Sequence, residues 1–138
     1  MQPIRVGRQG FLLIAAALSL LVPVSRARAQ AAPHLVLVKL VAKPNAQFAF
    51  DPADIVAQHG DTVRFVQMSV APHNVHFLKT PKGAKLGDAT TGPYIIGDGK
   101  TYDLVIDSRF VDGAYQFTCD PHETVGMHGT LTIGPSTK

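Results

Sequence analysis

Residues 117–129 bring several possible metal-binding side chains close together in the sequence. This run holds the only cysteine of the chain, Cys119, and His122 and Met127 follow it. A thiolate, an imidazole and a thioether within one short loop suit a copper ion that alternates between Cu(I) and Cu(II), and they suit Mg²⁺ or Ca²⁺ poorly. One further histidine from elsewhere in the chain would complete such a site.

The position of Cys119 in the sequence favours a rigid donor. Residues 114–118 have the pattern of a strand, whose hydrogen bonds would fix the direction of the cysteine that follows. The other two donors would lie on a turn held by Pro121 and Gly126. The alternative is that Cys119 is a buried small hydrophobic residue and that its neighbours stand there by chance.

The N-terminus has the pattern of a secretory signal peptide. Arg5 and Arg8 precede an apolar run over residues 11–22, and small residues follow. The apolar run is shorter than the ~20 residues that cross a bilayer, which favours a cleaved leader over a retained anchor. We predict a signal peptide at 1–29, cleaved after position 29 or 31, and a single domain at 30–138.

Loss of the leader changes the charge balance. Four arginines leave with it, so that nine basic residues face ten acidic ones, a formal net charge of −1. The basic isoelectric point therefore gives no support for binding to nucleic acid or an anionic membrane. We expect a periplasmic or secreted monomer without a membrane span, in which metal ligation would explain a free thiol in an oxidising compartment.

Short stretches rich in β-branched and aromatic residues alternate with turn signals along the rest of the chain. The stretches that favour strands are residues 34–43, 47–50, 54–57, 62–68, 74–78, 101–106, 114–118 and 129–133. No stretch has a sustained helical period, and residues 79–99 are interpreted mainly as a long surface connection. These features predict an all-β fold, an antiparallel Greek-key β-sandwich of about 7–8 short strands. Its core would contain aliphatic residues and Phe48, Phe50, Phe65, Phe77 and Phe117.

A second motif, residues 71–75, places His73 after a proline at the start of a strand. A single histidine in such a place is more often a polar turn residue than a ligand. Taken with the first motif, however, it makes the chain resemble the cupredoxin family of small blue copper proteins, most closely the plastocyanins and less closely the pseudoazurins and amicyanins. The matching features are Pro72-His73-Asn74, the Cys-x2-His-x4-Met run at Cys119, and Phe48-x-Phe50-x-Pro52 ahead of Gly60-Asp61-Thr62-Val63-x-Phe65.

The resemblance implies a ligand set for one type 1 copper ion. The equatorial ligands would be His73, Cys119 and His122, and Met127 would be the weak axial ligand. Asn74 matches the family's asparagine that ties the two ligand loops together by hydrogen bonds. Its partner is open, because Asp120, which precedes Pro121, stands where plastocyanins have a serine. A carboxylate beside the thiolate that is not turned to solvent would favour Cu(II) and lower the reduction potential.

Three other residues with soft or imidazole donors are weighed against this set. His128 directly follows Met127 and offers a competing fourth donor, although neighbours on a chain usually point opposite ways. The same alternation places His76 on the face opposite to His73. Met68 is more typical of a core methionine than of a ligand.

The resemblance implies a one-electron carrier that exchanges electrons with transient redox protein partners. With four protein donors in place, no position is left for a substrate, and we expect no catalysis by this chain alone. The alternative is a copper-binding protein for storage or delivery, which would favour exposed, exchangeable Met- or His-rich sites. An enzyme such as a nitrite reductase subunit would need a second copper centre. The residues of the predicted partner-docking patch are Ala71, Pro72, Pro121, Val125 and Gly126.

Overall fold

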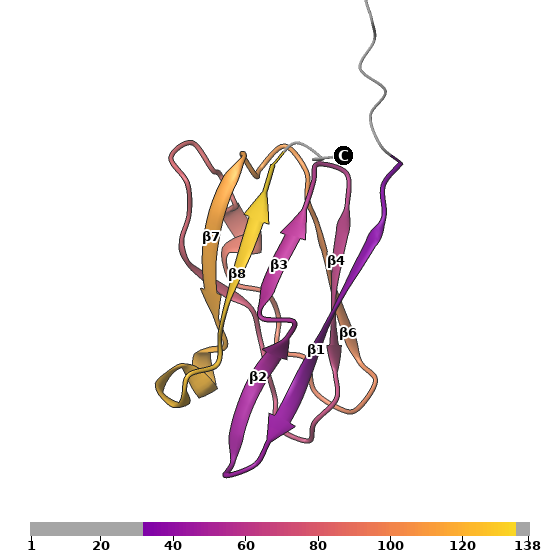
Figure 1. Cartoon of the computed structure of the whole chain (residues 1–138), viewed down its shortest axis with the longest axis vertical. Coiled ribbons are helices and arrows are strands. Elements are labelled where there is room, and N and C mark those ends of the chain that lie inside the picture. Colours follow the sequence, from indigo (N-terminus) through magenta and orange to yellow (C-terminus); the bar gives the residue numbers. More distant parts are fainter. Residues whose placement is uncertain (1–31, 135–138) are drawn as a thin grey trace, which may run out of the picture.

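The computed structural model describes residues 32–134, in which eight strands form two four-stranded sheets packed face to face (Figure 1). The strands are β1 (Leu35–Lys43), β2 (Gln47–Asp51), β3 (Asp54–Ala57), β4 (Thr62–Gln67), β5 (His76–Lys79), β6 (Thr101–Val105), β7 (Gly113–Thr118) and β8 (His128–Ile133). Two short 3₁₀ helices, η1 (Gly87–Thr90) and η2 (Asp120–Val125), lie in the connections. The β-sandwich and its number of strands confirm the prediction. The predicted signal peptide and its cleavage site lie outside the described residues.

The two sheets are mixed, not purely antiparallel. Their strand orders are β2-β1-β4-β6 and β3-β8-β7-β5, and the pairs β1/β4 and β3/β8 run parallel. Parallel neighbours need a connection that leaves the sheet and returns. Here β3 supplies it, because the chain passes from β2 into the other sheet at β3 before it comes back as β4. The sequence pattern of single strands carries no sign of this crossing.

The core lies between the sheets and is built from alternate residues of each strand. In β4, Val63, Phe65 and Gln67 are buried, while the residues between them are half-buried. Aromatic rings meet mainly edge to face in the centre, among them Phe65 and Phe117. The core also contains Phe110 and Tyr115, which the sequence analysis did not assign to it. Phe48, also predicted for the core, is half-buried and packs against its edge.

Residues 79–99 do more than connect two strands over the surface. This segment contains η1, and it buries Leu86, Ala89 and Ile95. Ile95 forms an isolated antiparallel bridge with His73. The interpretation as a surface connection was therefore incomplete. The sequence shows apolar residues within this polar segment, but it does not show which part of the fold they pack against.

The elements that carry the predicted ligands converge on one end of the sandwich. β4 leads to His73, β7 ends just before Cys119, and η2 joins β7 to β8 (lower end in Figure 1). The β1–β2 hairpin reaches the same end, where β2 approaches η2. No helix within residues 32–134 is long and apolar enough to cross a membrane.

Candidate metal centre

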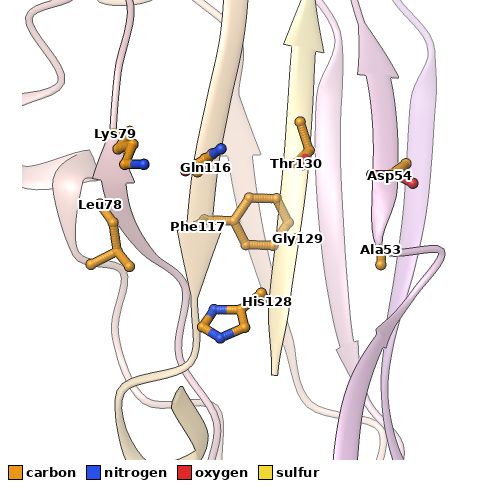
Figure 2. Close-up of a pocket in the computed structure, with 9 residues that line it drawn as sticks. All are labelled: Ala53, Asp54, Leu78, Lys79, Gln116, Phe117, His128, Gly129 and Thr130. Carbon is orange, nitrogen blue, oxygen red and sulfur yellow. The ribbon is translucent and has the colours of Figure 1, made fainter. Parts of the chain in front are cut away.

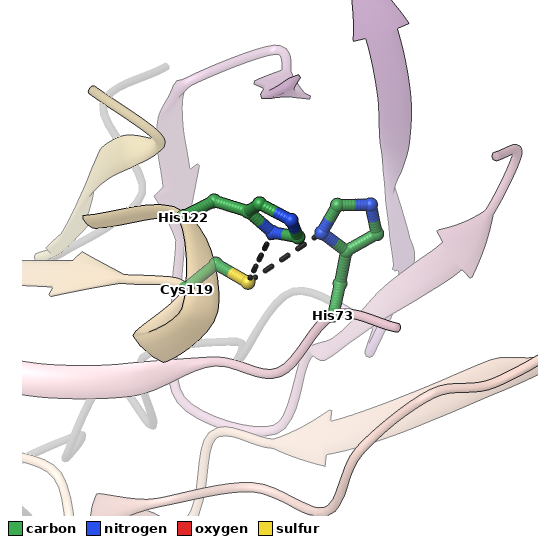
Figure 3. Close-up of side chains that lie close together, drawn as sticks. All are labelled: His73, Cys119 and His122. Atoms are coloured by element: carbon green, nitrogen blue, oxygen red, sulfur yellow. Dashed lines mark hydrogen bonds between the residues drawn. The ribbon is translucent and has the colours of Figure 1, made fainter. Parts of the chain in front are cut away.

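Three of the predicted ligands lie together at this end. The donor atoms of His73, Cys119 and His122 are all within 4.8 Å of one another. The Sγ atom of Cys119 lies 3.5 Å from Nδ1 of His73 and 3.4 Å from Nδ1 of His122 (Figure 3). The first two residues are fully buried and His122 is half-buried. The two motifs, 46 residues apart in the sequence, therefore form one site.

His73 is fixed by its main chain. Its N–H donates to the carbonyl oxygen of Ile95 at 3.2 Å, and the N–H of Ile95 donates back to His73 at 2.7 Å. The histidine thus lies in a short two-stranded bridge between β4 and β5. This bridge holds the backbone of the ligand in place whether or not a metal is bound.

The other donors lie on a loop closed by main-chain hydrogen bonds. The N–H of Cys119 donates to the carbonyl oxygen of Met127, and the N–H of Met127 donates to that of His122, each at 3.1 Å. Pro121 stands in the first turn of η2, and Gly126 ends it with a left-handed φ of 88°. A side chain is strained in that conformation, which accounts for a glycine there. The predicted turn held by Pro121 and Gly126 is confirmed.

Met127 and His128 point in different directions, as expected for neighbours. Met127 is fully buried within the ligand loop, whereas His128 is exposed. The imidazole of His128 borders a shallow pocket of about 430 Å³ on the outer face of the second sheet, beside Leu78 and Phe117 (Figure 2). His128 is also absent from the cluster of close donor atoms found among residues 32–134. The burial of Met127 and the exposure of His128 therefore favour Met127 as the fourth donor.

Burial favours the uncharged form of all three clustered side chains in the metal-free protein. Burial and then the nearby His122 lower the pKa of His73 to about 4, and burial lowers the pKa of His122 as well. Burial also raises the pKa of the Cys119 thiol, although main-chain N–H groups of Asn74 and His122 act in the opposite direction. Neutral imidazoles are ready to bind a cation, whereas the thiol must first lose its proton.

Asn74 ties the two ligand loops together, as the resemblance implied. Its side-chain amide donates to a carboxylate oxygen of Asp120 at 2.6 Å, and its carbonyl oxygen accepts from the Asp120 main-chain N–H at 2.8 Å. The other carboxylate oxygen lies 2.6 Å from Nδ1 of His76. Partial burial raises the pKa of Asp120, but the hydrogen bonds from Asn74 and His76 outweigh it and the pKa is lowered. The carboxylate is thus held by two partners, and sequence reasoning missed the second of them.

Phe48 is a further neighbour of the site that the sequence analysis assigned elsewhere. Its ring centroid lies 5.0 Å from that of His73 and 4.2 Å from that of His122. It therefore covers both imidazoles from the β1–β2 hairpin. The alternation of Phe48 and Phe50 indicates a shared face of β2, but it does not indicate that the first ring reaches past the core to the end of the sandwich.

The donor set fits copper. One thiol sulfur and two imidazole nitrogens converge from two loops, and a buried thioether residue lies on the same loop as the cysteine. Soft sulfur and imidazole donors in a trigonal set with a weak axial sulfur are typical of electron-transfer copper sites. The assignment of Met127 as the fourth ligand stays a prediction, which rests on its place in the loop and its burial.

Comparisons with known proteins agree with this chemistry. A family model described as copper binding proteins, plastocyanin/azurin family, matches residues 36–134. The plastocyanin of Scenedesmus fuscus is 33% identical over 100 residues, which cover 71% of this chain and 98% of that protein. The plastocyanin of Prochlorothrix hollandica is 36% identical over 84 residues, 61% of this chain, and the match spans only 62% of that relative.

Solved structures give the same result. The oxidised plastocyanin of Dryopteris crassirhizoma is 26% identical and superposes with a TM-score of 0.59, covering 72% of this chain and all of that one. A reduced amicyanin variant is 28% identical with a TM-score of 0.55, covering 72% of this chain and 82% of that one.

Proposed function

The chain belongs to the plastocyanin/azurin family of copper-binding proteins, and from this premise we propose that it is an exported one-electron carrier with a single type 1 copper ion. The ligands would be His73, Cys119, His122 and Met127. The observation that carries the proposal is the buried cysteine sulfur with two imidazole nitrogens within 3.5 Å. When bound, copper supplies a Cu(II)/Cu(I) couple that gains and loses one electron without a change in the protein's covalent structure.

The chain's own contribution is to hold the donors still. The main-chain bonds of His73 with Ile95, and of Cys119 with Met127, fix these residues independently of the metal. Asn74 links the two loops, so that one cannot move without the other. Donor side chains that the folded protein already holds in place move little when the charge of the ion changes. This suits rapid electron exchange. We expect no catalysis by this chain alone.

His122 is the proposed point of electron entry and exit. Within the donor cluster it is the half-buried member, while His73 and Cys119 are fully buried. Three residues of the predicted docking patch, Pro121, Val125 and Gly126, lie on the same loop as His122 and are exposed. On the other loop Pro72 is exposed and Ala71 is half-buried. A small apolar face suits a weak redox complex that must separate soon after transfer.

Long-range attraction would add little to this encounter. The charge without the leader is close to zero, although Lys79, Lys82 and Lys85 are all exposed and could favour an acidic partner. We propose that the partners are redox proteins bound transiently and that the protein acts as a monomer. A periplasmic or secreted location follows from the predicted leader.

The visible spectrum tests this function. The purified protein with one equivalent of Cu(II) should show an intense thiolate-to-copper band. Cys119→Ala should abolish the band and leave the far-ultraviolet circular dichroism of a β-sandwich, because the core does not depend on the metal. His128→Ala is the matched control and should keep the band. A wild-type protein that binds copper without the band would indicate a copper store or delivery protein instead.

A further inference from the structure

The side of the His73 ring that faces away from the donor cluster contacts a buried polar network. Its Nε2 atom lies 2.9 Å from Oγ of Ser69, and this hydroxyl lies 3.4 Å from Oε1 of Gln67. His73 and Gln67 have no solvent-exposed surface, and Ser69 is only 9% exposed. Polar groups at such depth have to satisfy one another, so each hydrogen in the network has a defined acceptor.

The direction of these hydrogen bonds follows from the amide of Gln67. Its nitrogen donates to the main-chain carbonyl oxygens of Ala71 and Ile95, the second at 3.0 Å. An amide nitrogen has two hydrogens, and both are used here. The oxygen of the Gln67 amide is therefore the end that faces Ser69, and it can only accept a hydrogen bond. The single hydrogen of the Ser69 hydroxyl can be directed to that oxygen across a long contact of 3.4 Å.

A hydroxyl that has given its hydrogen to Gln67 meets His73 with a lone pair. The Nε2 atom of the neutral imidazole must then carry the hydrogen, because two lone pairs at 2.9 Å would repel. A neutral imidazole has one N–H only, so Nδ1 is left with a free lone pair. That lone pair points to the donor cluster, 3.5 Å from the sulfur of Cys119.

We propose that Ser69, oriented by Gln67, is a positioning residue that holds metal-free His73 in the Nε2–H tautomer with Nδ1 ready to bind the ion. The inference rests on the proposed function, since it takes Nδ1 as the ligand atom. Metal binding then needs no proton shift and no ring flip at His73. The hydrogen bond from Nε2–H to Ser69 also makes Nδ1 a stronger donor, as outer partners of ligating histidines do. Within residues 32–134, His122 has no equivalent side-chain hydrogen-bond partner at Nε2, so it serves as an internal control.

Long-range ¹H–¹⁵N correlation spectra of the metal-free full chain, labelled with ¹⁵N, test the proposal directly. In the wild type we expect His73 as the Nε2–H tautomer. Ser69→Ala should give a mixture of tautomers at His73 and an unchanged His122, with a loss of about 10-fold in Cu(II) affinity by competition with a chelator. Ser69→Thr keeps the hydroxyl and should restore both the tautomer and the affinity.

Several results would overturn the proposal. The wild-type measurement needs no variant to fold, and an Nδ1–H tautomer at His73 would refute it outright. A folded Ser69→Ala protein with unchanged tautomer and affinity would do the same, as would a folded Ser69→Thr protein that behaves like Ser69→Ala. Failure of the proposed function is a separate observation, because it would appear as a copper-loaded wild type without the thiolate-to-copper band.

Discussion

Replacement of Asn74 by alanine should destabilise the metal-free protein by about 2–4 kcal/mol. The change removes two hydrogen bonds between the ligand loops, one to the Asp120 carboxylate at 2.6 Å and one from its main-chain N–H at 2.8 Å. A hydrogen bond to a charged group contributes about 1.5–3 kcal/mol, and one between neutral groups about 0.5–1.5 kcal/mol. Asn74 is only 1% exposed, so water cannot replace the hydrogen bonds that its side chain makes.

His76→Ala is the matched control, because it removes the other partner of the same carboxylate. The side chains of His76 and Asp120 are 32% and 35% exposed, and such a contact contributes only about 0–1 kcal/mol. Urea unfolding of both metal-free variants measures the difference in the free energy of unfolding. For a domain of this size each kcal/mol shifts Tm by about 4–8 °C, so the two variants should separate clearly in thermal scans as well.

The expected order is the test of the reasoning. If His76→Ala lowers the free energy of unfolding as much as Asn74→Ala does, the exposed contact between Asp120 and His76 matters as much as the buried one. The assignment of Asn74 as the tie between the loops would then be wrong. A loss below about 1 kcal/mol for Asn74→Ala would contradict it equally. Competition with a chelator adds a second measurement, because a looser connection between the loops should also weaken Cu(II) binding in the Asn74 variant.

Three further predictions concern the ligand set, the docking face and pH. Met127→Leu removes a weak donor that favours Cu(II) and should raise the reduction potential, Met127→Gln should lower it, and His128→Ala should change it less than either; voltammetry decides. Val125→Asp places a charge in the apolar face and should slow transfer to the redox partner in stopped-flow experiments without altering the visible spectrum. The free energy of unfolding of the metal-free protein should fall by up to about 3 kcal/mol as pH decreases from about 6.5 to 4. In that range His73 takes up a proton in the unfolded chain, where its pKa is ordinary, but not in the folded protein, where its pKa is about 4. Urea unfolding at several pH values should show this loss, and His73→Gln should flatten it.

The strands could be predicted from the sequence because their signal is local. In the segment that forms β4, Val63 and Phe65 alternate with polar residues, and this period specifies both the strand and its buried face. The candidate ligands of one motif could be predicted for a related reason, since Cys119, His122 and Met127 lie within one loop. His73 could be added only through the resemblance to a family, because a lone histidine after a proline has no chemical signature of its own.

The contacts that the sequence did not reveal join segments far apart in the chain. His76 and Asp120 are separated by 44 residues, and Gln67 is 28 residues from Ile95. His76, Asp120 and Gln67 are ordinary polar residues. Their contacts depend on the pairing of β5 with β7 and on the bridge that places Ile95 beside His73. Met68 shows the same limit, since a methionine expected in the core is 49% exposed just beyond the end of β4.

The same contacts favour the proposed carrier over a copper store. Within residues 32–134 no buried side-chain nitrogen or oxygen lacks a hydrogen-bond partner, so the polar groups that position the donors are already bonded before an ion arrives. Most of the entropic cost of ordering the donors is then met when the chain folds, not when the metal binds or changes charge. A store or delivery protein needs the opposite, donors that open to release the ion. Here two of the three clustered donors are fully enclosed, and the third, His122, is half-buried on η2 among exposed apolar residues. That arrangement supports the proposal that electrons enter and leave through the ring of His122, the least buried of the three clustered donors.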